Sequence, residues 1–181
     1  MQEMNSPWLL VALFIFHDGE EVLFLPTWVQ KNAVLFDELE SKLPFLKRSL
    51  HLLRHHNQKQ FNISVLLELA VLSFFSAAAV LFPQITWIRI AFISVLVLFT
   101  LHLVFHVVQS LFIHKVVPGT ITSILVFLPS LILWKNQIQS AGITWGLSMF
   151  YGLIVAILFI PLFPVILKIG HWAASPTKKL E

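Results

Sequence analysis

The residues best suited to chemistry lie near the start of the chain, in the segment HDGEE at residues 17–21. His17 precedes Glu20 by three positions and Glu21 by four, so on a helix these three side chains share one broad face. An imidazole and a carboxylate one helical turn apart can bind the same divalent ion. We expect one of the two glutamates to bind the ion and the other to move protons as a general base.

Three further ionisable side chains lie inside apolar segments that follow, namely Glu68, His102 and His106. His102 and His106 are four positions apart and therefore share one face of a helix. Imidazoles and carboxylates from facing helices are the ligands of metal sites in helix bundles. This donor set favours zinc, although iron and manganese also accept it. The predicted metal ligands are His17, Glu21, Glu68, His102 and His106, and the predicted catalytic residues are Glu20 and Glu21.

Each of these residues also has a simpler interpretation. The two glutamates of HDGEE could face headgroup water, although a span ending there would have only about 13 residues, too few to cross a bilayer. Glu68 could extend its carboxylate toward the membrane interface. His102 and His106 could be neutral side chains that are hydrogen-bonded within the bundle.

The composition sets the environment in which these residues must act. The chain has 181 residues, of which 57% are hydrophobic and 12% charged, and the apolar residues form long runs. This pattern excludes an ordinary soluble domain. The absence of cysteine excludes disulfides, thiolate zinc sites and cysteine nucleophiles. The formal charge of +3 comes from basic residues between the apolar runs, which indicates membrane orientation and not binding of nucleic acid.

A helix needs about 20 residues to cross the hydrocarbon core of a bilayer, and five segments come close to that length. We therefore predict an all-α, polytopic membrane helix bundle in a single domain, residues 1–179, with about five transmembrane helices. The fourth segment is short and contains Pro129. The predicted spans are residues 7–26, 63–82, 87–113, 121–134 and 143–167.

The basic residues predict how the spans are oriented. If all five cross, ten of the twelve Lys and Arg residues lie on one side and only Arg89 and Lys135 on the other. The side richer in basic residues is normally the cytoplasm, so the N-terminus is expected outside and the C-terminus inside. All the candidate metal ligands then lie in the cytoplasmic half of their spans.

The segment 27–61 mixes charged and apolar residues and is predicted to form one or two amphipathic helices on the cytoplasmic membrane surface, broken near Pro44. Its stretch RSLHLLRHHNQK, residues 48–59, is expected to contact anionic headgroups. A metal-binding or phosphate-binding role is the alternative for this stretch. The terminal Leu180 and Glu181 are typical of a remnant left by an expression vector, and no expectation rests on them.

The pattern resembles a family of bacterial membrane proteins named for an HxxEE motif, which also have a later histidine and a YxPG motif. HDGEE matches the first motif, and His106 best matches the later histidine. VVPG at residues 116–119 has Val116 in place of the tyrosine, whereas Pro118 and Gly119 match. The resemblance covers the first four spans. It implies a bacterial cell membrane location and a joint role for these residues, but no particular activity.

A weaker similarity of chemistry links the glutamate pair to intramembrane CAAX-type proteases. Their first motif reads EExxxR, and this chain has Leu25 at the position of the arginine. We treat this as a similarity of active-site chemistry and not as evidence of an evolutionary relationship.

These observations favour a membrane enzyme with a divalent metal in the cytoplasmic leaflet. Its substrate would be lipid-like or delivered through the membrane, and hydrolysis is favoured over oxidation. Two alternatives remain open: a small proton-coupled transporter that uses the Glu and His side chains as a relay, and a non-catalytic immunity or regulatory protein. A homodimer could complete a transport pathway that one chain is too small to form.

Overall fold

The structure is a computed structural model that describes residues 6–174, and within that range every regular element is an α-helix. Leu180 and Glu181 lie outside the described residues. The seven helices are α1 (Trp8–Lys31), α2 (Ala33–Lys42), α3 (Lys47–His55), α4 (Gln58–Leu81), α5 (Thr86–Ile113), α6 (Thr120–Ala141) and α7 (Trp145–Ala174).

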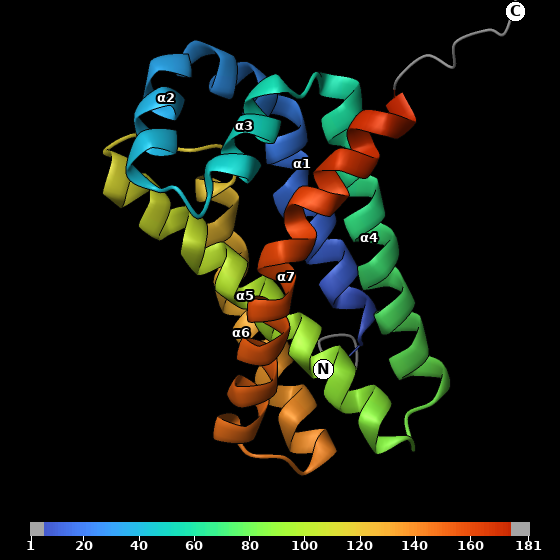
Figure 1. Ribbon diagram of the computed structural model, residues 1–181. Helices are drawn as coiled ribbons and strands as arrows, with labels where there is room; N and C mark the ends of the chain where they lie inside the picture. Colours follow the sequence, from blue (N-terminus) through green and yellow to red (C-terminus); the bar gives the residue numbers. More distant parts are fainter. Residues whose placement is uncertain (1–5, 175–181) are drawn as a thin grey trace, which may run out of the picture.

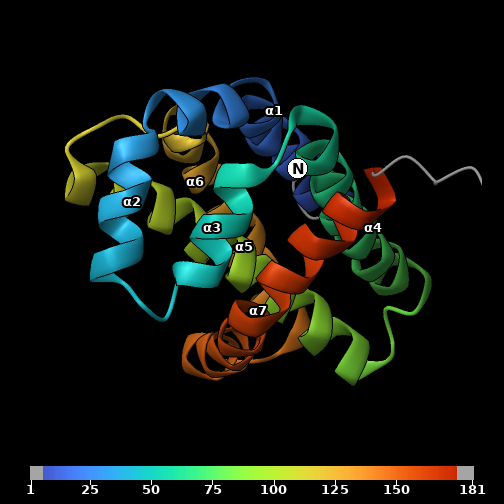
Figure 2. The same cartoon turned by 45° about the horizontal axis from the view of Figure 1, so that its top comes forward.

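Five of these helices run along the length of the molecule, and successive ones point in opposite directions (Figure 1). The start of α1 and the connections α4–α5 and α6–α7 lie at one end of the bundle. The short helices α2 and α3 lie across the other end, as the view from that end shows (Figure 2). The protein is thus an all-α bundle of antiparallel long helices.

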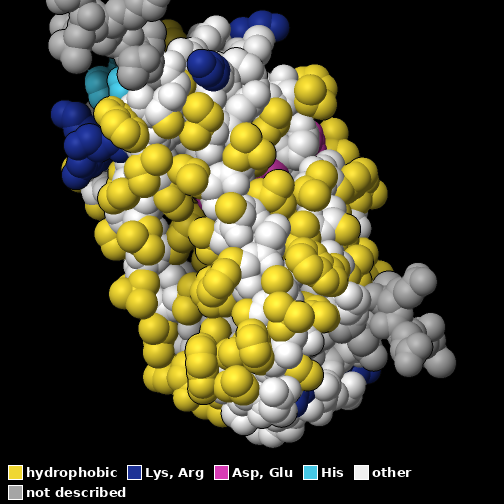
Figure 3. All heavy atoms as spheres, turned by 90° about the vertical axis from the view of Figure 1, so that its right-hand side faces the viewer, with side chains coloured by type: hydrophobic (Ala, Val, Ile, Leu, Met, Phe, Trp, Pro, Cys, Tyr) yellow, Lys and Arg dark blue, Asp and Glu magenta, His cyan; other side chains and the backbone are white. Residues whose placement is uncertain are grey.

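The long helices have the composition of membrane spans. Among the described residues, α4, α5, α6 and α7 are long and apolar enough to cross a membrane. The helix α1 has 24 residues, the same length as α4, but carries Asp18, Glu20 and Glu21 near its middle. Apolar side chains cover the flank of the bundle over most of its height, whereas most Lys and Arg side chains visible on that flank lie near one end (Figure 3). The protein is therefore a membrane protein with about five transmembrane helices.

Several helices extend beyond the apolar segments that predicted them. The fourth span, predicted as residues 121–134, belongs to a helix that continues to Ala141 and ends where Gly142 adopts a left-handed conformation. Its Pro129 is accommodated inside the helix. The helix α7 likewise reaches Ala174 and contains Pro161 and Pro164. Backbone hydrogen bonding does not stop where the side chains become polar, so hydropathy marks the apolar part of a helix and not its ends.

The segment between α1 and α4 forms two short helices, with Pro44 in the connection between them. An ion pair between Arg54 and Asp37 links α3 to α2. The side chains Leu25 and Val29 of α1 form an apolar cluster with Phe36 of α2, against which Leu53 of α3 packs. The two short helices are thus attached to one end of the bundle by apolar contacts as well as charge.

The main core lies between the long helices, and it positions the faces that carry the ionisable residues. The helix α5 is the most buried, with Phe92, Leu96 and Leu103 almost inaccessible to solvent. On α1, Leu10 and Phe14 join the same core, and the Phe14 ring lies 6.2 Å from that of Phe99, measured between centroids. Because α1 and α5 share this core, the residues one or two turns further along these helices also face each other.

Candidate metal centre

Four of the predicted ligands form a buried group between α1 and α5. One ligand atom from each of His17, Glu21, His102 and His106 can be chosen so that all four lie within 4.8 Å of one another. On each helix the two residues are four positions apart, so each pair occupies one face. The two faces are directed at each other because the shared core fixes the rotation of both helices.

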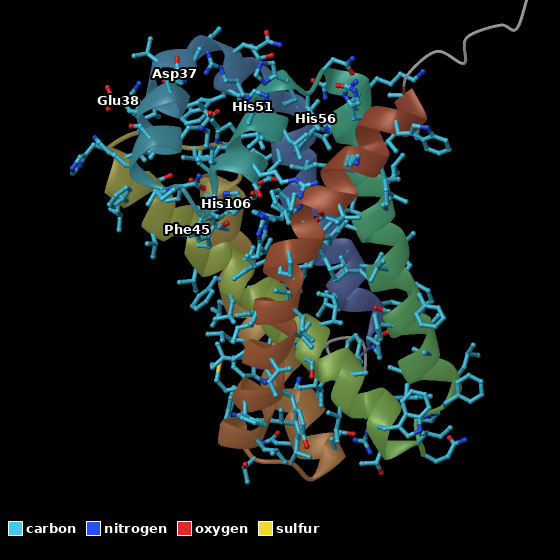
Figure 4. All side chains as sticks on the ribbon, in the orientation of Figure 1. Asp37, Glu38, Phe45, His51, His56 and His106 are labelled. Carbon is cyan, nitrogen blue, oxygen red and sulfur yellow. The ribbon has the colours of Figure 1, made fainter. Side chains whose placement is uncertain are left out.

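The contacts inside this group join a carboxylate to two imidazoles. His106 Nε2 lies 2.7 Å from Glu21 Oε1 and 3.1 Å from His102 Nε2. The centroid of the His17 ring lies 5.1 Å from those of His102 and His106. The exposed fractions are 0% for His17 and 5% for His106, Glu21 is also buried, and His102 is half-buried. In Figure 4, His106 projects from α5 below the end of the bundle that carries His51 and His56.

A threonine of α6 holds two side chains of the HDGEE motif in place. Glu20 Oε2 accepts hydrogen bonds from the Thr122 backbone N at 3.0 Å and from Thr122 Oγ1 at 2.7 Å. His17 Nδ1 lies 3.0 Å from the same hydroxyl oxygen. Since the hydroxyl proton is donated to the stronger acceptor, the carboxylate, we assign the remaining bond as His17 Nδ1–H donating to Thr122 Oγ1.

This assignment leaves the other nitrogen of His17 as a lone-pair donor. His17 Nε2 is buried and makes no hydrogen bond. A histidine that ligates a metal usually donates its second ring N–H to an oxygen atom, which fixes the tautomer and the ring orientation. Thr122 supplies that oxygen here, so His17 is oriented as a ligand would be.

Gly119, in the turn before α6, lies directly against the same group. Its φ of +93° belongs to the left-handed region that favours glycine. A Cβ atom on Gly119 would lie 2.9 Å from Glu21 Oε1 and 3.0 Å from His106 Nδ1. The turn is held by Ser110, whose Oγ accepts a hydrogen bond of 3.0 Å from the Val117 backbone N. The turn therefore lies against the Glu21–His106 contact. A larger residue at position 119 would push the turn away from these two side chains.

Two acidic residues near the group are placed differently from the sequence expectation. Glu68, predicted to be a ligand, lies half-buried on α4 outside the group of four. Asp18, which by helical spacing does not share the face of His17 and Glu21, is nevertheless only 3% exposed, and its Oδ1 has no hydrogen-bond partner. Asp18, Glu68 and Glu21 lie close enough to interact electrostatically. The helix α4 thus adds a carboxyl group beside the site without adding a ligand.

The donor set and its spacing fit a divalent ion. Tetrahedral zinc with ligand bonds of about 2.0–2.1 Å separates its donor atoms by about 3.3 Å, close to the 3.1 Å between His106 Nε2 and His102 Nε2. Among the described residues, Glu21 makes no ion pair with Lys or Arg, and its close side-chain partner is His106. A cation between these four side chains would therefore neutralise a buried charge as well as complete their contacts.

A helical membrane bundle with a buried histidine–glutamate cluster is the class of protein that this fold and site define. The chain belongs to the family described as "Protein of unknown function with HXXEE motif", whose model matches residues 8–134. That stretch contains all four clustered residues and Thr122, and it ends before α7. The resemblance predicted from HDGEE, His106 and the Pro-Gly turn is thereby confirmed.

One relative shows a similarity along nearly the whole chain. The "Uncharacterized protein YrkK" of Bacillus subtilis (strain 168) is 27% identical over 168 residues, which cover 88% of this chain and 94% of YrkK. No solved structure matches the chain.

Sequence reasoning missed Thr122 and the close approach of Gly119. The signal that could have indicated both is the segment PGTIT, which places a tight turn and two threonines at the start of a span. Threonine is common in apolar helices, where its hydroxyl usually bonds within its own helix, as Thr100 does with the Leu96 carbonyl. Only the contact with α1 distinguishes Thr122 from Thr100.

We expect Gly119→Ala to disturb the site beyond its effect on the backbone. The new Cβ should push apart Glu21 and His106, in addition to a cost of about 1–2 kcal/mol for a left-handed non-glycine residue. The matched control is Gly142→Ala, since Gly142 has a φ of +67° but nothing within 4 Å of its added Cβ. Thermal unfolding in detergent should show a larger decrease in Tm for Gly119→Ala, and equal decreases would contradict the contact.

Thr122→Val should destabilise the protein more than Thr100→Val. The first substitution removes the hydroxyl from both Glu20 and His17 and leaves buried polar groups unpaired, which typically costs about 1–3 kcal/mol. The second removes a hydroxyl whose bond lies within its own helix. Denaturant unfolding of the two variants in the same detergent measures the difference, and the prediction fails if Thr100→Val is as destabilising as Thr122→Val.

Proposed function

We propose that the chain is an integral membrane metal-dependent enzyme that acts on a lipid-like or membrane-delivered substrate, with hydrolysis favoured over oxidation. The observation that carries this proposal is the group of four side chains whose ligand atoms lie within 4.8 Å of one another, together with the buried, unpaired Nε2 of His17. The four side chains that would hold the ion are His17, Glu21, His102 and His106. Three imidazoles and one carboxylate favour zinc, whereas iron or manganese would be compatible with oxidation.

The two glutamates of the motif would have different roles. A divalent ion lowers the pKa of a bound water toward neutrality when it is held in such a site. Glu21, in contact with His106, belongs to the ligand set. Glu20 is outside that set, and its Oε2 is oriented by Thr122. Glu20 is therefore our candidate for the general base, connected to His17 through the threonine hydroxyl.

The surroundings of the site support a substrate that arrives from the membrane. The cluster lies within a bundle whose flank is covered with apolar side chains (Figure 3). A polar, water-soluble substrate would have to lose its hydration to reach this depth, whereas a lipid-like chain would not.

A proton relay is the second candidate function. His106 Nε2 lies 2.7 Å from Glu21 Oε1 and 3.1 Å from His102 Nε2, so a proton on this nitrogen could pass to either side chain. Asp18 and Glu68 would extend such a path, since both interact electrostatically with Glu21. Buried carboxylates and histidines in membrane helices are typical of proton-coupled transporters.

The metal content of the purified protein distinguishes the two. Elemental analysis of the detergent-solubilised chain should give about one divalent ion per chain, bound by a four-residue donor set. His17→Ala and His106→Ala should each remove most of it, whereas the control His55→Ala, on an exposed position of α3, should retain it. The wild type should also release products from a bacterial lipid extract, and His17→Ala should not.

Equal metal loss in all three variants would contradict the site, and a folded, metal-free wild type would contradict the enzyme. Proton flux in liposomes, abolished by Glu21→Gln, would then favour the relay. A metal-free protein without flux, destabilised by the same substitutions, would instead indicate that the cluster only locks the helices together.

We also propose that the N-terminus lies outside the cell and the C-terminus in the cytoplasm, with the basic helix α3 against anionic headgroups. The ten-to-two distribution of basic residues supports this orientation. The chain has no cysteine, so single introduced cysteines report accessibility cleanly. In intact cells an impermeant maleimide should label Gln84→Cys, between α4 and α5, but should label Ser41→Cys on α2 only after permeabilisation. The reverse pattern would overturn the orientation.

A further inference from the structure

His56 is held in an arrangement that requires a positive charge. This residue lies between α3 and α4, and its side chain is only 4% exposed. Its Nδ1 is 2.5 Å from the Leu52 carbonyl oxygen and its Nε2 is 2.7 Å from the Leu167 carbonyl oxygen. A carbonyl oxygen can only accept, so both ring nitrogens must donate, and a histidine with two N–H groups is a cation.

The neighbouring His171 of α7 is held as an acceptor instead. Gln60 Oε1 accepts a hydrogen bond of 2.9 Å from the Asn57 backbone N, which fixes the orientation of the amide. The amide nitrogen of Gln60 therefore faces His171 Nδ1 at 2.9 Å and donates to it. The rings of His56 and His171 are 6.1 Å apart between centroids. Of these two adjacent imidazoles, the structure thus requires the charge on His56 only.

The electrostatic surroundings of His56 give its charge little other support. Leu52 lies in the last turn of α3, so its carbonyl is at the negative end of that helix. The helix α1 contributes the apolar residues Val22 and Trp28 to the cluster against which α3 also packs. No described carboxylate forms an ion pair with His56, and the Asp37 carboxylate is paired with Arg54. The nearest remaining titratable residues in the sequence around His56 and Leu167 are basic, namely His55, Lys59, Lys168 and His171.

The two carbonyl bonds connect separate parts of the fold. Leu52 belongs to α3, whereas Leu167 belongs to α7, which is far along the sequence. The helix α7 lies very close to α4 at this level, because a Cβ atom on Gly170 would overlap Ser64 Oγ and lie 2.5 Å from the Gln60 carbonyl oxygen. This close crossing brings the Leu167 carbonyl within reach of His56.

We propose that His56 is a protonation-dependent latch that fastens α3 to α7 across the end of the bundle that carries the basic helices. Loss of one proton would leave a nitrogen lone pair facing a carbonyl oxygen, which repels it, so the contact would open. Low pH therefore favours the closed arrangement and high pH favours release of α3. The latch depends on neither a metal nor a catalytic role for the cluster.

The distance between α3 and α7 provides the test, and the cysteine-free chain suits spin labelling. Ser49→Cys on α3 and Ile169→Cys on α7 would carry the labels, in full-length protein in lipid nanodiscs. Pulsed electron paramagnetic resonance should give one short distance at about pH 5.5 and a longer, broader distribution at about pH 8.5, the range in which histidine changes charge.

Two variants separate the latch from a general effect of pH. His56→Gln should give the long, broad distribution at both pH values, because an amide has a donor at only one end and cannot bond both carbonyls. His55→Gln, at the exposed neighbouring position, should behave as the wild type. An unchanged distance in the wild type, or a wild-type pH response in His56→Gln, would overturn the proposal.

A second measurement covers the case in which His56→Gln fails to fold. Nitrogen-15 NMR of histidine-labelled wild-type protein distinguishes a ring with two N–H groups from either neutral tautomer. At about pH 6 the wild type should show a buried, doubly protonated ring that exchanges slowly with water. A wild-type spectrum in which every buried ring is neutral would overturn the latch without use of any variant.

Discussion

Polar side chains within this bundle can find hydrogen-bond partners only in other parts of the chain, since the surrounding lipid offers none. The HDGEE motif places four such side chains in the middle of α1, and three of them have partners on two other helices. His106 of α5 contacts Glu21, and Thr122 of α6 contacts both Glu20 and His17. These contacts are consistent with the rotation of α1 that the apolar core sets, and they place α6 against it.

The same constraint explains why the Pro-Gly turn accompanies the motif. For Thr122 to reach α1, α6 must begin beside the Glu21–His106 pair, and the turn before it must pass against that pair. Only a residue without a side chain fits at Gly119, where a Cβ would lie 2.9 Å from Glu21. The motif, the later histidine and the glycine are therefore parts of one packing arrangement. Val116 is 64% exposed, so its position is not constrained in this way.

Two histidines at different depths show how hydrogen-bond partners determine protonation. At His17 a hydroxyl accepts from Nδ1 and no partner faces Nε2, which leaves a neutral ring with an available lone pair. At His56 two carbonyl oxygens face the two nitrogens, which requires a cation. The first arrangement suits a metal ligand within the bundle. The second suits a contact at its end that responds to pH.

The sequence by itself determined the membrane class, the approximate spans and the pairing of His17 with Glu21 and of His102 with His106. These features depend on apolar runs and on four-residue spacing within single helices. Only the tertiary structure placed Asp18 inside, left Glu68 out of the cluster, extended α6 to Ala141 and connected Thr122 to α1. Periodicity fixes which residues share a face of one helix, but the rotation and axial offset between helices are set by how their side chains pack.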